Sequence, residues 1–160
     1  MSDFFLKIDG IAGGSRDAEH NDEIEIESWG FVAEQTGAGD YGSGAGVGRL
    51  RIEDLRFSMP VNKATPALFR ACSTGRHLSK VVLTCRQRTG AGQHDHLQWT
   101  FEDVIVSRYE TGGTSNGEMV TDRVSLNFSR AIVKFVDVKP DGTLGGEVEA
   151  GWDLRTNRSL

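Results

Sequence analysis

Residues 96–110 read HLQWTFEDVIVSRYE, and this stretch decides the fold class. It is long and rich in valine, isoleucine, leucine and aromatic residues, which favour strands. Two further stretches have the same character, LSKVVLTCRQR at 78–88 and DRVSLNFSRAIVKFVDV at 122–138. Clusters of turn-forming glycine, asparagine, aspartate or serine separate the three. The second half of the chain is therefore predicted to form long β-strands.

The first half of the chain shows the alternation of half-exposed strands. The stretch DFFLKID (residues 3–9) places Phe4, Leu6 and Ile8 on one face. The stretch DEIEIESWGFV (residues 22–32) places its two isoleucines on one face and its glutamates on the other. A period of two residues is typical of a strand with one buried and one wet side.

The stretch RLRIEDLRFSMPV (residues 49–61) carries two alternations that are out of phase. Its apolar residues occupy even positions up to Ile52 and odd positions from Leu55 onward. A shift by one residue would turn a strand inside out, so the pattern predicts a β-bulge near Glu53 and Asp54.

Only ATPALFRACSTGR (residues 64–76) indicates a helix, over about 65–74. Thr65 can serve as N-cap, Pro66 suits the first helical position, and Gly75 can end the helix. One helix among long strands cannot build a doubly wound α/β fold. We expect a mainly β fold, a closed or nearly closed antiparallel barrel or sandwich of two sheets with one flanking helix.

Composition narrows the classes of function. The 160 residues suit one domain, 1–160, and 26% of them are charged with a net charge of −5, which gives no general attraction to nucleic acid or an anionic membrane. No stretch approaches the roughly 18 apolar residues of a membrane span, and the N-terminus lacks a secretory signal, so we expect folding in the cytoplasm. Cys72 and Cys85 have no metal-ligand spacing and are interpreted as small buried hydrophobes.

Residues 36–48, TGAGDYGSGAGVG, contain the spelling G-x-G-x-x-G of a dinucleotide-binding turn. Such a turn needs a helix N-terminus directly after it to hold the phosphates, whereas here the glycines continue into a predicted strand. Phosphate binding is therefore disfavoured. A long, glycine-rich extended loop inside a compact domain is typically either functional or disordered, and it can become ordered against another subunit.

The other candidate sites are weaker. His94 and His96 would lie on one face of a strand, but the distant His20 and His77 give no metal-site spacing, so a polar hairpin tip is the favoured interpretation. The acidic stretch DGIAGGSRDAEHNDEIE (residues 9–25) lacks the calcium-loop pattern and is interpreted as a solvated loop. No catalytic motif or cofactor motif is present, so the sequence predicts neither an enzyme nor a metal site.

Several blocks, in order, carry a family resemblance. FFLKIDGIAGGSRDAEHNDEIEIESWGF, ATPALFRACSTGRHLSKVVLTCR, FEDVIVSRYETGG, VSLNFSRAIVKF and DGTLGGEVEAGWDLRTN together cover most of the chain. They resemble the Hcp family, the haemolysin-coregulated proteins of bacterial type VI secretion systems. The resemblance implies a β-barrel with one flanking helix, in agreement with the periodicity.

The resemblance also implies a structural function without catalysis or a cofactor. Subunits would form six-membered rings that stack into a hollow tube, which a contractile sheath expels with a spike protein at its tip. Effector proteins would travel in the lumen, and the tube protein would be secreted without a cleaved signal peptide. No nucleic acid or membrane partner is expected.

The resemblance assigns roles to two segments. The loop at 36–48 would reach toward the neighbouring ring, and its expected ring-stacking residues are Thr36, Gly37, Gly39, Asp40, Tyr41, Gly42, Gly44, Gly46 and Gly48. The resemblance does not assign the contact to single residues; we expect Asp40 and Tyr41 to make it, because they carry the only sizeable side chains in the loop. The segment near Trp29 and Gly30 would border the lumen and its cargo, although it departs from the usual family pattern. Two alternatives stay open: a phage-like tail-tube protein, and a metal- or ligand-binding β-barrel protein that uses His94 and His96.

Overall fold

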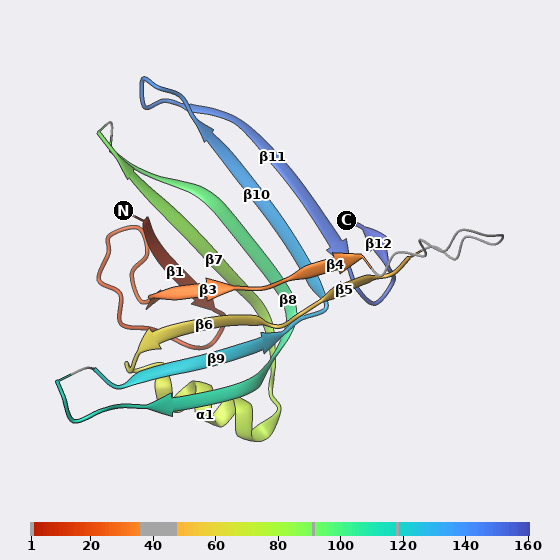
Figure 1. Cartoon of the computed structure of the whole chain (residues 1–160). Coiled ribbons are helices and arrows are strands. Elements are labelled where there is room, and N and C mark those ends of the chain that lie inside the picture. Colours follow the sequence, from red (N-terminus) through yellow and green to blue (C-terminus); the bar gives the residue numbers. More distant parts are fainter. Residues whose placement is uncertain (1, 36–47, 91, 118) are drawn as a thin grey trace.

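The computed structural model describes residues 2–35, 48–90, 92–117 and 119–160 (Figure 1). The described chain is mainly antiparallel strand with one helix, α1 (Thr65–Thr74). The strands are β1 (Ser2–Ile8), β2 (Ile24–Ile26), β3 (Ser28–Gly30), β4 (Ala33–Gln35), β5 (Leu50–Ile52), β6 (Leu55–Pro60), β7 (His77–Thr89), β8 (Gly92–Gly112), β9 (Thr121–Asn127), β10 (Arg130–Val138), β11 (Leu144–Asp153) and β12 (Arg158–Ser159).

The strands of the described residues form two antiparallel sheets, as the sequence predicts. The larger sheet runs β12-β11-β10-β8-β7-β1-β2, and it continues from β8 through β9 and β6 to β3; β4 and β5 pair with each other. Only Glu27 separates β2 from β3, and its N–H donates to the carbonyl of Ser58 in β6 (2.8 Å). The sheet thus curls back on itself. It is not a regular closed barrel, because the closing contacts are short: β2 pairs with β1 over three residues, and β3 pairs with β6 over three residues.

Strand β8 joins the two layers of the fold (Figure 1). It pairs with β10 up to Glu102 and with β9 from Ile105 onward. Between them Asp103 has a φ of 53°, a left-handed conformation that aspartate tolerates better than most residues. Its carboxylate accepts hydrogen bonds from His77 (3.0 Å) and Ser129 (2.9 Å), which fix the bend.

Helix α1 spans the range predicted from the sequence, but its N-cap is not the predicted residue. Gly75 ends the helix with a φ of 65°, as expected for a left-handed C-cap. The N-cap is Ala64, without a side-chain cap. The hydroxyl of Thr65, the expected cap, instead accepts a hydrogen bond from the N–H of Asn62 (3.1 Å) and donates one to Asp122 in β9 (2.7 Å). The hydroxyl of Thr65 is thus engaged by Asp122, a residue distant in sequence, and does not cap the helix.

The predicted β-bulge near Glu53 and Asp54 is wrong. These residues separate β5 from β6, and the two strands belong to different sheets. β6 alternates buried residues with exposed or half-buried ones, beginning with the buried Leu55, whereas the apolar residues of β5 are only half-buried. The change of phase in the sequence therefore marks a change of sheet.

The core lies between the curled sheet and the helix, which packs against β8. Phe101, at the middle of β8, is fully buried and touches the ring of Phe128 with 4.6 Å between centroids. The other large, fully buried side chains are Leu6, Ile24, Leu55, Met59, Leu68, Leu78, Leu83 and Leu126.

Candidate functional site

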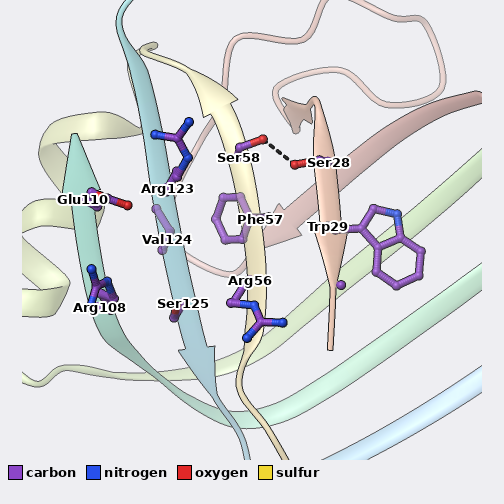
Figure 2. Close-up of a pocket in the computed structure, with 11 residues that line it drawn as sticks. Ser28, Trp29, Arg56, Phe57, Ser58, Arg108, Glu110, Arg123, Val124 and Ser125 are labelled. Carbon is purple, nitrogen blue, oxygen red and sulfur yellow. Dashed lines mark hydrogen bonds between the residues drawn. The ribbon is translucent and has the colours of Figure 1, made fainter. Parts of the chain in front are cut away.

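An open groove of about 680 Å³ lies across β3, β6, β9 and β8 (Figure 2). Strand alternation places polar side chains in it. Phe57 of β6 and Val124 of β9 are buried in the core, at 3% and 1% exposure. Because successive side chains of a strand point to opposite faces, their neighbours point into the groove. The lining residues are Ser28, Trp29, Gly30, Arg56, Phe57, Ser58, Arg108, Glu110, Arg123, Val124 and Ser125.

Strand register arranges the polar lining in two rows. The direct cross-strand neighbours are, in the first row, Ser28, Ser58, Arg123 and Glu110 and, in the second, Gly30, Arg56, Ser125 and Arg108. In the first row the hydroxyls of Ser28 and Ser58 are hydrogen-bonded at 2.5 Å (Figure 2). In the second row Ser125 of β9 separates Arg56 of β6 from Arg108 of β8.

Arg56, Arg108 and Arg123, the groove arginines, have little compensating charge. Arg56 lies 3.7 Å from Glu53, and both side chains are largely exposed, so this pair is weak. No carboxylate among the described residues forms an ion pair with Arg108 or Arg123. The lining thus offers positive charge and hydroxyl groups. It has no histidine, no cysteine and only one carboxylate, so it suits binding of an anionic group better than acid–base chemistry.

A second charged cluster holds the loop of residues 9–23, between β1 and β2, against the β7–β8 hairpin. Arg86 of β7 is only 2% exposed. Its guanidinium donates two hydrogen bonds to Asp17 (2.7 and 3.0 Å), one to Asp95 (3.3 Å) and one to Glu19 (3.3 Å). These bonds hold the pKa of Asp17 well below its usual 3.8 and raise the pKa of Arg86.

His20 completes this cluster. The imidazole ring of His20 stacks on the ring of Phe5 with 4.3 Å between centroids. The guanidinium of Arg86 lies 5.0 Å from the centroid of the Phe5 ring. The two ring nitrogens of His20 contact the carboxylates of Glu23 and Asp95. The interpretation of residues 9–25 as a solvated loop is therefore wrong for the side of the loop that faces the sheet, because His20 and Ser15 are buried.

Glu19, His20 and Asp95 bring potential metal-ligating atoms within 4.8 Å of one another. Both nitrogens of His20 already contact carboxylates, and Arg86 supplies the positive charge that the acids need. The cluster is accounted for as an ion-pair network.

His94 and His96 flank Asp95 on β8, and His94 Nε2 and His96 Nδ1 have no hydrogen-bond partner among the described residues.

With this geometry established, comparison with known proteins gives the family. The model of a family described as "Type VI secretion system effector, Hcp" matches residues 5–135. Protein hcp1 from Pseudomonas aeruginosa is 37% identical over 156 residues, which are 97% of this chain and 96% of that protein. The chain belongs to the Hcp family.

Solved Hcp structures agree with the fold. The crystal structure of Hcp1 from Salmonella typhimurium has a TM-score of 0.83, 31% identity and 99% coverage of both chains. A structure described as that of a type six secretion system protein covers both chains fully with a TM-score of 0.92; at 23% identity it supports the fold alone. Within the described part of this Hcp chain, no helix is long and apolar enough to cross a membrane.

The structure brings Trp29 and Gly30 to the edge of the groove. The ring of Trp29 turns toward Phe4, with 6.2 Å between centroids. Nearby, burial raises the pKa of Cys85 to about 11, an effect that a hydrogen bond with Trp29 opposes only in part. Cys85 is thus the small buried residue that the sequence predicts, whereas the same prediction holds only in part for Cys72, which is half-buried.

Most of the expected ring-stacking residues lie outside the described residues. Only Gly48 is described; it is half-buried and precedes β5. β4 and β5, which flank the loop, pair antiparallel from Ala33–Ile52 to Gln35–Leu50. The sequence had no signal for the groove arginines, whose arrangement depends on pairing between strands, or for the carboxylate partners of Arg86, most of which lie in a loop far away in sequence.

Proposed function

We propose that this Hcp chain is a structural, non-catalytic component of the type VI secretion tube. As a single domain, it would assemble into six-membered rings that stack into a hollow tube, be expelled by sheath contraction behind a spike protein, and be secreted with effectors in the lumen. The observation that carries the proposal is the 37% identity to Protein hcp1 over nearly the full length of both chains. It requires no cofactor.

The β10–β11 hairpin supports ring formation. Phe135 of β10 and Val148 of β11 are direct cross-strand partners, and they are 45% and 69% exposed. Leu144 at the start of β11 is 61% exposed. β10 loses its β8 partner beyond the Phe135–Leu97 pair, so its remaining residues form a free edge among the described strands. Exposed apolar residues beside a free edge favour association with another copy.

The loop at 36–48 is proposed as the ring-stacking arm, and the groove beside Gly30 as a cargo contact. In Figure 1 the β4–β5 ribbon extends away from the helix and from the tips of the long hairpins, which supports a contact separate from the β10–β11 tip. The three residues of β4 are all exposed. Stacking should be weaker than ring closure, because the tube must also come apart.

Light scattering after size exclusion, followed by electron microscopy, tests the ring. We expect the mass of six chains and an open centre; a stable monomer would contradict the proposal. Val148→Glu should yield monomers because it places a charge in the proposed interface. Met119→Glu is the matched control, since Met119 is 67% exposed outside that hairpin.

Deletion of residues 38–46 should leave rings intact and abolish tube growth at high protein concentration; unchanged growth would refute the stacking role.

A further inference from the structure

We propose that the groove binds an acidic, extended segment of a partner protein, with the groove arginines pairing with its carboxylates. This inference rests on the proposed function for its setting, since the acidic segment would belong to a cargo protein carried in the tube. It rests on this chain's own residues for its chemistry.

Charge complementarity is the first argument. The groove arginines face one surface, and Glu110 is the only acid in the lining. Arg56 and Arg108 are two strands apart across Ser125, so their Cα atoms are separated by about 10 Å. Carboxylates two residues apart in an extended peptide point to the same side about 7 Å apart, and two long arginine side chains whose Cα atoms lie about 10 Å apart can converge on that spacing. Arginine forms bidentate hydrogen bonds with carboxylates of this kind.

The shape of the groove is the second argument. A Cβ added to Gly30 would meet no atom within 4 Å, so the end of the Arg56 row is open. The hydroxyl of Ser125, between the two arginines, can donate to a carboxylate or to a peptide carbonyl. The groove is open rather than enclosed, which fits a strand-like segment better than a small enclosed ligand.

A nucleic acid fits the same surface less well. Its binding sites combine a basic track with exposed aromatic rings on which bases stack. The only aromatic residues in the lining are Trp29, whose ring turns toward Phe4, and the buried Phe57. The whole chain carries a net charge of −5, which opposes a polyanion beyond the groove.

Fluorescence anisotropy with the full chain tests the inference. The probe is a labelled twelve-residue peptide with glutamate at every second position, and its glutamine counterpart is the neutral reference. We expect the glutamate peptide to bind, the glutamine peptide to bind at least about tenfold more weakly, and added salt to reduce the difference. Tighter binding of a twelve-nucleotide single strand than of the glutamate peptide would overturn the choice of a protein partner.

Matched variants locate the binding. Arg56→Ser, Arg108→Ser and Arg123→Ser combined should weaken binding of the glutamate peptide at least about tenfold. The control combines Arg16→Ser, Arg70→Ser and Arg158→Ser, which removes the same charge from exposed positions elsewhere and should change binding less than about threefold. Equal losses in both sets would show general charge attraction and overturn the inference.

A steric variant keeps the charge unchanged. Gly30→Tyr should fill the open end of the row and weaken peptide binding, whereas Gly112→Tyr, also into open space but outside the groove, should not. Normal binding to Gly30→Tyr would contradict the inference. Light scattering of the same samples separates the two proposals: rings without peptide binding refute only the groove assignment, and monomers refute the tube.

Discussion

Arginine occupies two opposite environments in this protein. Arg86 is almost completely buried and donates to three carboxylates, whereas the groove arginines are exposed and share one weak ion pair among the described residues. Both groups lie on strands of the same sheet. The difference lies in what covers the strand: the loop of residues 9–23 crosses over Arg86, and no described segment crosses the groove arginines.

The comparison separates a structural charge from an interaction charge. A guanidinium removed from water must be fully paired, because an unpaired buried charge costs several kcal/mol. Arg86 therefore fixes the loop that pairs with it. An exposed guanidinium keeps its hydration and contributes little to stability, so it remains available to a partner.

Replacement of Arg86 by methionine should have the largest effect. It removes the bidentate pair with Asp17 and the bond to Asp95, while methionine fills the space of the aliphatic part of the side chain. The carboxylates are partly exposed and can rehydrate, so we expect a loss of about 3 kcal/mol in the free energy of unfolding. Urea denaturation measures it. Arg108→Met is the control; equal losses would remove the distinction between the two environments.

Asp17→Asn should have a smaller effect, because Asp95 and Glu19 still pair with Arg86. The pKa of Asp17 is lowered in the folded state, so the stabilisation it provides is complete above its usual pKa of 3.8 and is lost as the pH falls below that value. The native protein should therefore lose stability below about pH 4 more steeply than Asp17→Asn. Parallel pH dependences in the two proteins would show that this ion pair is not responsible.

Phe5→Leu should cost about 1 kcal/mol. The substitution keeps an apolar side chain at a buried position, but it removes the ring on which His20 stacks and over which Arg86 lies. Thermal unfolding measures the change. Phe4→Leu, on the same strand but away from Arg86, provides the reference, and a double-mutant cycle with Arg86→Met should show coupling for Phe5 alone.

The groove arginines should give the smallest change in stability. Arg123→Ser should change the free energy of unfolding by no more than about 0.5 kcal/mol, since Arg123 is exposed and has no ion pair among the described residues. Chemical denaturation checks this value beside Arg86→Met. A loss above 1 kcal/mol would mean that the groove is part of the folding framework, and it would weaken the interaction role.

Much of the fold could be predicted from local patterns. The helix at 65–74 follows from Pro66 and Gly75, and the buried Ile24 and Ile26 follow from alternation, because these features depend on neighbours in the chain. The expected cap at Thr65 and the expected bulge near Glu53 failed for one reason. In both cases a residue far away in sequence, or a different sheet, supplied the partner.

The candidate site was only partly predictable. The resemblance pointed to the segment near Trp29 and Gly30 only as a border of the lumen; both residues line the groove, and the lumen role stays a prediction. The acidic residues 9–25 were visible in the sequence, but their role was not. Arg86 and Asp17 are 69 residues apart, so no local pattern indicates their pair.

The sequence by itself determined the family, the helix, most of the strand-forming stretches and the absence of a recognisable catalytic motif, because periodicity, turn residues and family blocks are properties of the linear chain; it did not show that the stretch 122–138 divides into β9 and β10. The tertiary structure alone decided which arginine is structural and which is available. That distinction depends on strand register, which places Arg56 opposite Ser125, and on the path of a loop that covers one charged side chain and leaves the others in water.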